Sequence, residues 1–267
     1  KYMFNRENRA TIGFGSKFDV MQLGASLMYD EGIMTPSYGS SGILTSGSNA
    51  SLSFVKQNNL FFSMEPIRNF TVRLDASLQN IISANPEKFN LDFYKDNTLK
   101  SGLTDFHTTF SLVLQPDAKY VQYGVDRTTL RTLAPTFILK YTHGFANVLE
   151  GDFDYNKLQF LYAQKILLGN LGKTNVNFEA GKNFDAVPLA IQTIIPGNQS
   201  YFLAFNTFSL LKYYEFVADT YTTMNVEHHF NGKLISYVPL IKKLKLRELI
   251  FFRGAYGTLS DAAKNIN

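Results

Sequence analysis

Cysteine is absent from this 267-residue sequence, and only four histidines are present. A chain without cysteine has no disulfide, no thiolate-bound zinc, no iron–sulfur cluster and no thiol nucleophile. Four histidines leave little for a histidine metal site, and no G-x-S-x-G, P-loop or H-E-x-x-H motif occurs. The sequence therefore offers no catalytic residues, no metal ligands and no cofactor, and we expect a protein that is not an enzyme.

Charge is also sparse. Asp, Glu, Lys and Arg make up 18% of the residues, and the basic residues exceed the acidic ones by only 26 to 22. No run of Lys and Arg resembles a nucleic-acid-binding arm, so we expect no nucleic-acid partner. Aromatic residues, in contrast, reach 15%, with 24 Phe and 15 Tyr. This aromatic content excludes a disordered chain.

Long hydrophobic runs are missing as well. A membrane-spanning helix needs about 20 mostly apolar residues in a row. The longest uncharged stretch, 186–211, contains two prolines, a glycine and several Asn, Gln and Ser residues, and predicts an irregular connection. The chain begins at Lys1 without an apolar leader, so its location has to be inferred from the remaining sequence.

What recurs instead is the period-two alternation of strands with two unlike faces. In 71–79, for example, Val72 and Leu74 share one face, whereas Arg73 and Asp75 share the other. Turn-forming stretches separate such segments, and 169–172 predicts a tight β-hairpin. The sequence thus predicts an all-β fold of antiparallel hairpins, which we treat as a single domain over 1–267. The predicted strands are 12–18, 21–29, 51–62, 71–79, 105–115, 136–144, 158–168, 175–181, 216–230 and 246–257.

The same alternation fits two kinds of protein. In a soluble β-sandwich or lipocalin-like barrel the apolar face points to a core, whereas in a membrane barrel it meets lipid and the polar face lines the interior. Three features favour the membrane. Several segments approach the ~9–11 residues of a tilted membrane strand. Aromatic residues lie near strand ends, as in an interfacial girdle. The polar face mixes Asn, Thr, Ser, Gly, Glu and Arg rather than Lys and Glu alone. The girdle candidates are Tyr29, Tyr141, Phe145, Phe184, Phe230 and Tyr256.

The order of motifs in the C-terminal third is more specific. It runs from Pro196-Gly197-Asn198-Gln199-Ser200-Tyr201 through Asn225-Val226-Glu227-His228-His229-Phe230-Asn231-Gly232 to Pro239-Leu240-Ile241-Lys242-Lys243-Leu244-Lys245-Leu246-Arg247-Glu248. This order resembles a Bacteroidota family of outer-membrane barrels of unassigned function, whose members usually carry a carboxypeptidase-regulatory-like β-sandwich ahead of the barrel. The run from Pro239 onward is also similar to the last part of BamA/TamA-like barrels. The resemblance covers residues 130–261 best.

The resemblance implies an antiparallel transmembrane β-barrel of outer-membrane type, located in the outer membrane of a Gram-negative bacterium. Its expected partners are outer-membrane lipids, lipopolysaccharide and other envelope proteins. Its expected role is that of a non-enzymatic subunit of an envelope complex or of outer-membrane protein biogenesis. No β-sandwich precedes the barrel, and the chain ends in the loop-like residues 264–267. We therefore expect an incomplete barrel, whose closing strands and N-terminal periplasmic domain belong to a longer protein.

Two sets of residues are candidates for the functional surfaces. The polar residues expected to face the barrel lumen are Arg73, Asp75, Asn175, Asn177, Glu179 and Glu227. The basic residues expected to contact lipid headgroups are Lys242, Lys243, Lys245 and Arg247, with a solvated turn as the equally weighted alternative. His228 and His229 point to opposite faces of a strand and cannot chelate one ion together. Two alternatives to the favoured role stay open: an outer-membrane transport channel or receptor, and a soluble β-sandwich binding module.

Overall fold

The computed structural model describes residues 2–5, 9–21, 27–30, 33–36, 53–123, 126–130, 133–197, 207–211, 215–237, 244 and 246–261. Within these ranges the regular structure is almost entirely β, accompanied by two short 3-10 turns at Gly169–Leu171 and Ile235–Tyr237. The described part of the chain contains no helix that is long and apolar enough to span a membrane. The predicted all-β class is confirmed.

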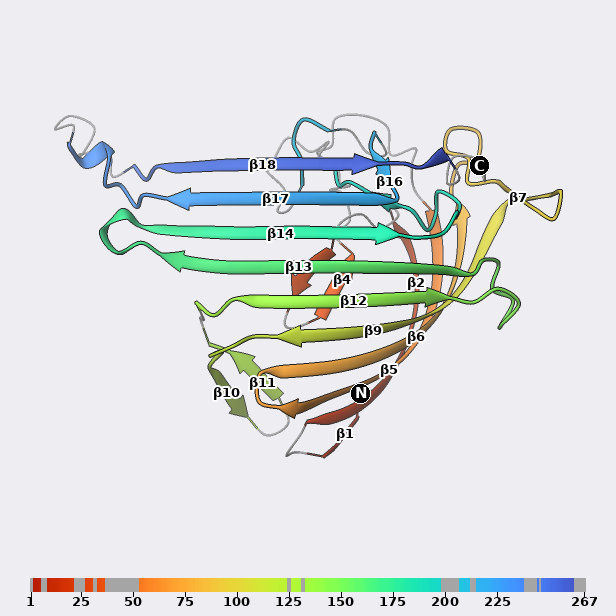
Figure 1. The fold of residues 1–267 in the computed structure, drawn as a ribbon, viewed down its shortest axis with the longest axis horizontal. Coiled ribbons are helices and arrows are strands. Elements are labelled where there is room, and N and C mark those ends of the chain that lie inside the picture. The colour runs from red at the N-terminus through yellow and green to blue at the C-terminus, as the bar shows by residue number, and fades with distance from the viewer. Residues whose placement is uncertain are drawn as a thin grey trace.

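Ten strands form one large antiparallel sheet, in which each strand pairs with the next along the chain (Figure 1). Their bounds are β1 (Tyr2–Asn5), β2 (Ala10–Met21), β5 (Ser53–Ile67), β6 (Phe70–Ser83), β9 (Gly102–Leu114), β12 (Thr136–Gly144), β13 (Tyr155–Leu167), β14 (Lys173–Asn183), β17 (Thr220–His229) and β18 (Leu249–Thr258).

In the described residues, four two-stranded sheets accompany the large sheet within the connections between its strands. They are β3 (Leu27–Asp30) with β4 (Ile33–Pro36), β7 (Phe93–Lys95) with β8 (Thr98–Lys100), β10 (Tyr120–Tyr123) with β11 (Asp126–Thr129), and β15 (Thr193–Ile194) with β16 (Val217–Ala218). In Figure 1 the strands from β2 to β9 bend strongly at the right, so the large sheet is curved rather than flat.

The outermost strands of the sheet are β1 and β18, and in the described residues no pairing joins them. The predicted antiparallel sheet is therefore present, and its closure into a transmembrane barrel stays a prediction. The central strands are long. β5 has 15 residues and β6 has 14, well above the ~5–6 of an average soluble strand.

Most predicted strands coincide with observed ones. The segment 136–144 is β12, and 71–79, 105–115 and 175–181 fall on β6, β9 and β14. The predicted hairpin at 169–172 is confirmed: it joins β13 to β14, with glycines in the left-handed region at 169 (φ 56°) and 172 (φ 100°). The predicted strand 216–230 is interrupted, because Asp219 separates β16 from β17. The predicted strand 21–29 is not one strand: Met21 ends β2, Leu27 begins β3, and 22–26 lie outside the described residues.

The sheet has an outward face and an inward face, which we define by one row of cross-strand neighbours each. Neighbours directly opposite each other on adjacent strands point to the same face. The outward row runs through Ile12, Phe62, Leu74, Phe110, Tyr141 and Leu158. The inward row, shifted by one residue on every strand, runs through Thr11, Ser63, Arg73, Ser111, Lys140 and Gln159.

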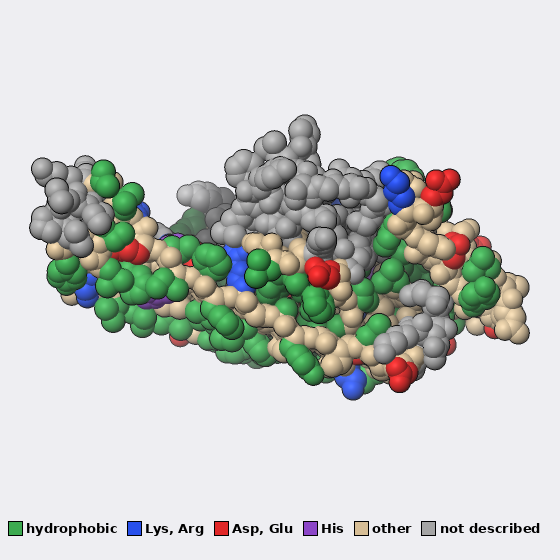
Figure 2. Space-filling view, turned by 90° about the horizontal axis from the view of Figure 1, so that it is seen from above, with side chains coloured by type: hydrophobic (Ala, Val, Ile, Leu, Met, Phe, Trp, Pro, Cys, Tyr) green, Lys and Arg blue, Asp and Glu red, His purple; other side chains and the backbone are tan. Residues whose placement is uncertain are grey.

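The hydrophobic side chains of the sheet thus gather on its outward face. Figure 2 shows them as a band along the lower side of the molecule. Phe14 is 68% exposed, Phe252 60% and Leu74 49%, so this face is largely uncovered. A soluble sheet buries its apolar face, and here the apolar face is the open one.

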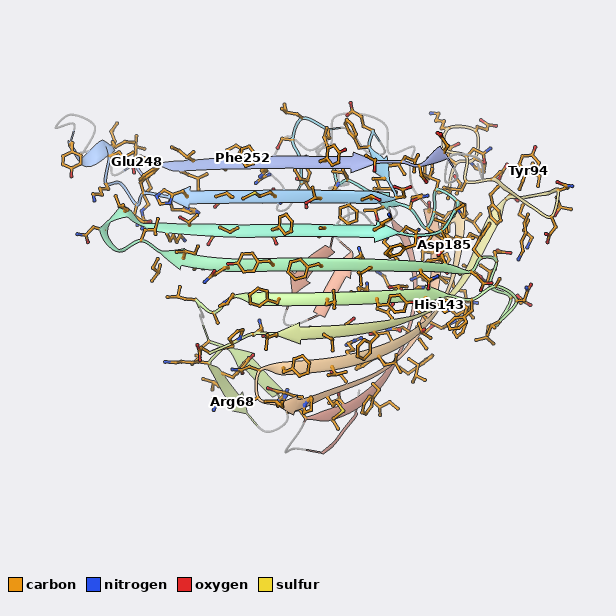
Figure 3. All side chains as sticks on the ribbon, in the orientation of Figure 1. Arg68, Tyr94, His143, Asp185, Glu248 and Phe252 are labelled. Atoms are coloured by element: carbon orange, nitrogen blue, oxygen red, sulfur yellow. The ribbon has the colours of Figure 1, made fainter. Side chains whose placement is uncertain are left out.

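The two ends of the strands differ in their connections. We call them the Arg68 end and the Tyr94 end, after the residues labelled at the left and right of Figure 3. β5 and β6 meet at the Arg68 end through residues 68–69, and β13 and β14 through 168–172. At the Tyr94 end, residues 84–101, 145–154 and 184–219 connect the strands.

The largest hydrophobic core lies at the Tyr94 end, on the inward side of the sheet. Val55, Ile81 and Leu103 point inward from β5, β6 and β9. They pack with Leu91 and Phe93 from the connection 84–101, and with residues of the connection 184–219. The connections therefore fold over the inward face, which leaves the outward face bare. A smaller core of Val113, Ile138 and Leu161 lies on the inward face further along the strands.

Candidate functional site: the polar inward face

The inward face carries the polar and charged side chains that the alternation predicts. Its charged members in the central strands include Arg73, Asp75, Asp105, Lys140, Lys157 and Glu179. Both signs occur: Arg73 pairs with Asp75, and tyrosine hydroxyls donate to Asp105 and Glu179. The face therefore carries balanced charge rather than a patch of one sign.

Arg73 and Asp75 form a two-pronged ion pair on this face. Arg73 Nε donates to Asp75 Oδ2 at 2.7 Å and Nη2 donates to Oδ1 at 2.6 Å, a two-pronged pair. Asn59 Nδ2 donates to the same carboxylate at 3.3 Å, and the guanidinium carbon lies 4.0 Å from the centre of the Phe61 ring. Two residues chosen from the sequence therefore meet, two positions apart on β6.

A second network centres on Tyr221, which is almost completely buried (3% exposed). Its hydroxyl donates to Glu179 Oε1 at 2.5 Å and accepts from Gln159 Nε2 at 2.8 Å. The ring lies over Gly181, where a Cβ would come within 2.6 Å of Tyr221 Cε1. Glu179 was identified from the sequence, whereas Tyr221 and Gln159 were missed, although both fall on the polar face of their strands.

A third network joins Asp105, His107 and Tyr155. His107 Nδ1 lies 2.7 Å from Asp105 Oδ2, and the Tyr155 hydroxyl donates to both carboxylate oxygens at 3.2 Å. Ser77 stands directly opposite His107 on β6. The Ser77 hydroxyl, however, accepts a hydrogen bond from Gln57 Nε2 at 3.1 Å. A serine, a histidine and an aspartate thus share one face, yet the serine hydroxyl is engaged by Gln57.

The remaining lumen candidates lie toward the Arg68 end. Asn175 stands opposite Glu227, and Asn177 opposite Asn225, on β14 and β17. Glu227 Oε1 lies 2.5 Å from His229 Nε2, within hydrogen-bonding distance. Like Arg73, Asp75 and Glu179, these three candidates occupy the inward face. The structure thus puts all six on one face but distributes them over separate clusters.

His228 lies on the outward side, as the alternation predicts. Its Nδ1 is 2.8 Å from the Thr174 hydroxyl, and its Nε2 is 3.0 Å from the Leu171 carbonyl oxygen. Among the described residues no group of three or more His, Cys, Asp or Glu side chains is arranged to hold a metal ion.

The headgroup candidates are only partly described. Lys242, Lys243 and Lys245 lie outside the described residues. Arg247 is exposed and precedes β18 at the Arg68 end. Its neighbour Glu248, labelled at the far left of Figure 3, accepts hydrogen bonds from the amides of Gly232 and Ile235 and so fixes the connection between β17 and β18.

Several aromatic residues of the outward face lie near the Tyr94 end. The Tyr141 hydroxyl donates to Asn156 Oδ1 at 2.6 Å, and the His143 and Phe145 rings lie 4.4 Å apart. The Lys182 ammonium lies 5.4 Å from the centre of the Phe184 ring. Of the predicted girdle, Tyr141, Phe145, Phe184 and Tyr256 lie in or directly after strands near this end, and Phe230 follows β17 at the other. The side chain of Tyr29 is outside the described part.

Two carboxylates anchor the connections at the Tyr94 end. Asp152 accepts hydrogen bonds from Lys100 Nζ (2.7 Å), Lys95 Nζ (3.1 Å) and the Thr104 amide (2.9 Å). Burial alone would raise the pKa of Asp152, but these hydrogen bonds outweigh it and hold the pKa below its ordinary value. The pKa of Asp219 is likewise lowered, because hydrogen bonds from Ser260 and Thr220 outweigh its burial.

Fold and faces together define the class of protein: an all-β chain with one large antiparallel sheet, whose outward face is largely apolar and whose inward face carries polar clusters beside two apolar cores. Residues 49–260 match a family model described as the C-terminal domain of a family of unknown function, DUF5686. The match covers most of the chain, and the chain belongs to this family. No curated protein matches it. The Bacteroidota origin and the similarity to BamA/TamA-like barrels stay predictions.

Proposed function

We propose that this chain forms the wall of an integral outer-membrane β-barrel in a Gram-negative bacterium. In this role it is a non-enzymatic subunit of an envelope complex or of outer-membrane protein biogenesis, of the BamA/TamA-like kind. Its lipid partners are the outer-membrane lipids and lipopolysaccharide that surround the outward face. Other envelope proteins would bind at its ends.

The observation that carries the proposal is that neighbouring residues of each strand differ in polarity according to the face on which they lie. The outward row Ile12–Phe62–Leu74–Phe110–Tyr141–Leu158 is apolar throughout, whereas the neighbouring inward row is polar throughout. Lipid-facing strands need an apolar exterior, and a membrane barrel tolerates a polar interior. The aromatic residues near the Tyr94 end match the position of an interfacial girdle.

Backbone hydrogen bonding explains why such a sheet would close. A bilayer offers no partner for the free N–H and C=O groups of an edge strand, and each unsatisfied group costs several kcal/mol. The free edges of β1 and β18 would therefore be paired in the membrane, either with each other or with further strands. Because β1 and β18 run in opposite directions along the sheet, a direct pairing between them would be antiparallel.

The first test is the mobility of the protein on an SDS gel. The full-length protein, taken from isolated outer membranes in mild detergent, would be run unheated and boiled. A closed barrel resists SDS until it is heated, so the unheated sample should migrate differently. Stoichiometric partners that co-purify would support the complex-subunit role, and a shift without partners would support the channel alternative. A protein without a shift that stays soluble after detergent removal contradicts the membrane proposal.

A matched pair of single cysteines tests the two faces directly, because the chain has no native cysteine. Phe62 points outward and the adjacent Ser63 inward on β5. A fluorophore on Phe62→Cys should be quenched by spin-labelled lipid, whereas one on Ser63→Cys should not. If aqueous iodide quenches both fluorophores equally and spin-labelled lipid quenches neither, the membrane proposal is contradicted. That result would favour the soluble β-sandwich binding module.

A further inference from the structure

The connection between β14 and β17, residues 184–219, crosses the inward side of the sheet and contacts strands on both sides. At one side it contacts β18, the last strand of the sheet. At the other it joins the hydrophobic core built on β5, β6 and β9, which belong to the other half of the strand order. This course can be followed in the described parts of the connection, 184–197, 207–211 and 215–219.

Contacts with β18 fix the first side. Arg253 points inward from β18, and its Nη1 donates to the Thr207 carbonyl oxygen at 2.7 Å. Gly257 also faces inward, and a Cβ there would lie 2.9 Å from Ala218 Cβ and 3.5 Å from Ile195 Cδ1. The connection therefore rests directly on the strand, at a position where a larger residue would push it away.

Hydrophobic packing fixes the other side. Val187, Ile191 and Ile194 are buried in the same cluster as the wall residues Val55, Ile81 and Leu103. Val187 has no exposed surface, and Ile194 is 4% exposed. Leu91 and Phe93, from the connection 84–101, belong to the same cluster. Two connections thus meet across the inward side and exclude water there.

Backbone hydrogen bonds hold the crossing segment together. Ile194 pairs with Val217 through β15 and β16, and the Ile195 amide donates to the Phe216 carbonyl oxygen at 3.0 Å. The Phe208 amide donates to the Pro196 carbonyl oxygen at 2.9 Å. The described parts of the segment are therefore bonded to each other, unlike a loose strand tip in solvent.

From these contacts we propose that the apolar cluster of Leu91, Phe93, Val187, Ile191 and Ile194 is a plug that closes the barrel lumen at the Tyr94 end. The inference rests on the proposed barrel. It distinguishes the two membrane roles, because a barrel closed by a dry apolar plug does not conduct ions. The polar network on the inward face then serves to stabilise the wall and the plug rather than to line a permeation path.

Conductance of the purified full-length protein in planar bilayers tests the plug. The unsubstituted protein should show no stepwise current. The double variant Ile191→Asp/Ile194→Asp puts two carboxylates into the apolar cluster, where their unpaired charge is unfavourable. Its open-channel frequency should rise by at least about tenfold, as expected when the closed state loses its preference over the open state.

Leu210→Asp is the matched control. Leu210 lies in the same connection but is 97% exposed and takes no part in the cluster, so this variant should stay silent. If the double Asp variant does not fold, Ile191→Ala/Ile194→Ala decides the question, because it loosens the cluster without adding charge. It should conduct more often than the control.

The gel shift of the same samples separates the two proposals. An unsubstituted protein that lacks the heat-dependent shift contradicts the barrel itself. A protein that shows the shift and also conducts without any substitution contradicts the plug alone. The plug is equally contradicted when heat-modifiable cluster variants stay as silent as Leu210→Asp.

Discussion

Tyrosines over glycines are the most informative contacts at the scale of single residues. Tyr155 lies over Gly144, where a Cβ would come within 2.1 Å of Tyr155 Cε1, and Tyr221 lies over Gly181 in the same manner. In each case the missing side chain makes room for a ring whose hydroxyl reaches a carboxylate, Asp105 or Glu179. The glycines are therefore needed for space on the inward face.

Substituting Tyr221 by Phe should destabilise the protein by about 1–3 kcal/mol, because Gln159 and Glu179 lose a buried partner. Urea unfolding in lipid vesicles measures the loss. Tyr94→Phe is the control. Because Tyr94 is 63% exposed, loss of its hydroxyl should leave the free energy of unfolding unchanged. Equal values for both variants would show that the Tyr221 network contributes nothing to stability.

Sequence alternation predicts on which face a residue lies, but not which residues touch. The lumen candidates share a face as predicted, since period two is a property of any strand. Their partners depend on strand register, which joins Glu179 of β14 to Tyr221 of β17 across 42 residues. Nothing local in the sequence specifies that contact, so Tyr221, Gln159 and Tyr155 were not identified.

At the scale of elements, long strands were predicted well and short ones poorly. The strands of the large sheet repeat the alternation several times, whereas β15 and β16 have two residues each, too few for any period. Of the connection 184–219, the stretch 186–211 was predicted only as irregular. Its packing against β5, β6 and β9 depends on burial that the other connections create, and that burial is not encoded in the segment itself.

A charge on the outward face of β5 provides an element-scale prediction. Leu60 lies on that face between Phe14 and Ala76. In a bilayer Leu60→Lys should destabilise the folded protein, lowering its free energy of unfolding by about 2–4 kcal/mol. Gln57→Lys, on the inward face of the same strand, should have a much smaller effect. Folding titrations in lipid vesicles compare the two, and a Leu60→Lys variant as stable as Gln57→Lys would place Leu60 outside lipid.

At the scale of the whole molecule, the carboxylates Asp152 and Asp219 make stability depend on pH. The pKa of each is lower in the folded protein than in the unfolded chain, where the pKa of an aspartate is about 3.9. Each therefore contributes stability in full above that pH, and the contribution is lost as the pH falls through the lower, folded pKa.

Acid should consequently destabilise the Tyr94 end, and the urea midpoint should fall between about pH 5 and pH 2. Asp152→Asn/Asp219→Asn should have a lower midpoint at neutral pH and a flatter dependence below it. Glu87→Gln removes an exposed carboxylate and should follow the unsubstituted protein at every pH. A double variant with an unchanged slope would show that other groups govern the acid transition.

The bare outward face also determines how the protein can be handled. A folded molecule released into water would expose one continuous hydrophobic surface to other molecules. This surface includes Phe14, Leu74, Phe110 and Phe252. Collisions between such molecules would lead to aggregation, faster at higher concentration. In the proposed membrane role, the chain would need a chaperone that shields this surface before insertion, and a purified sample would need a detergent or lipid in its place.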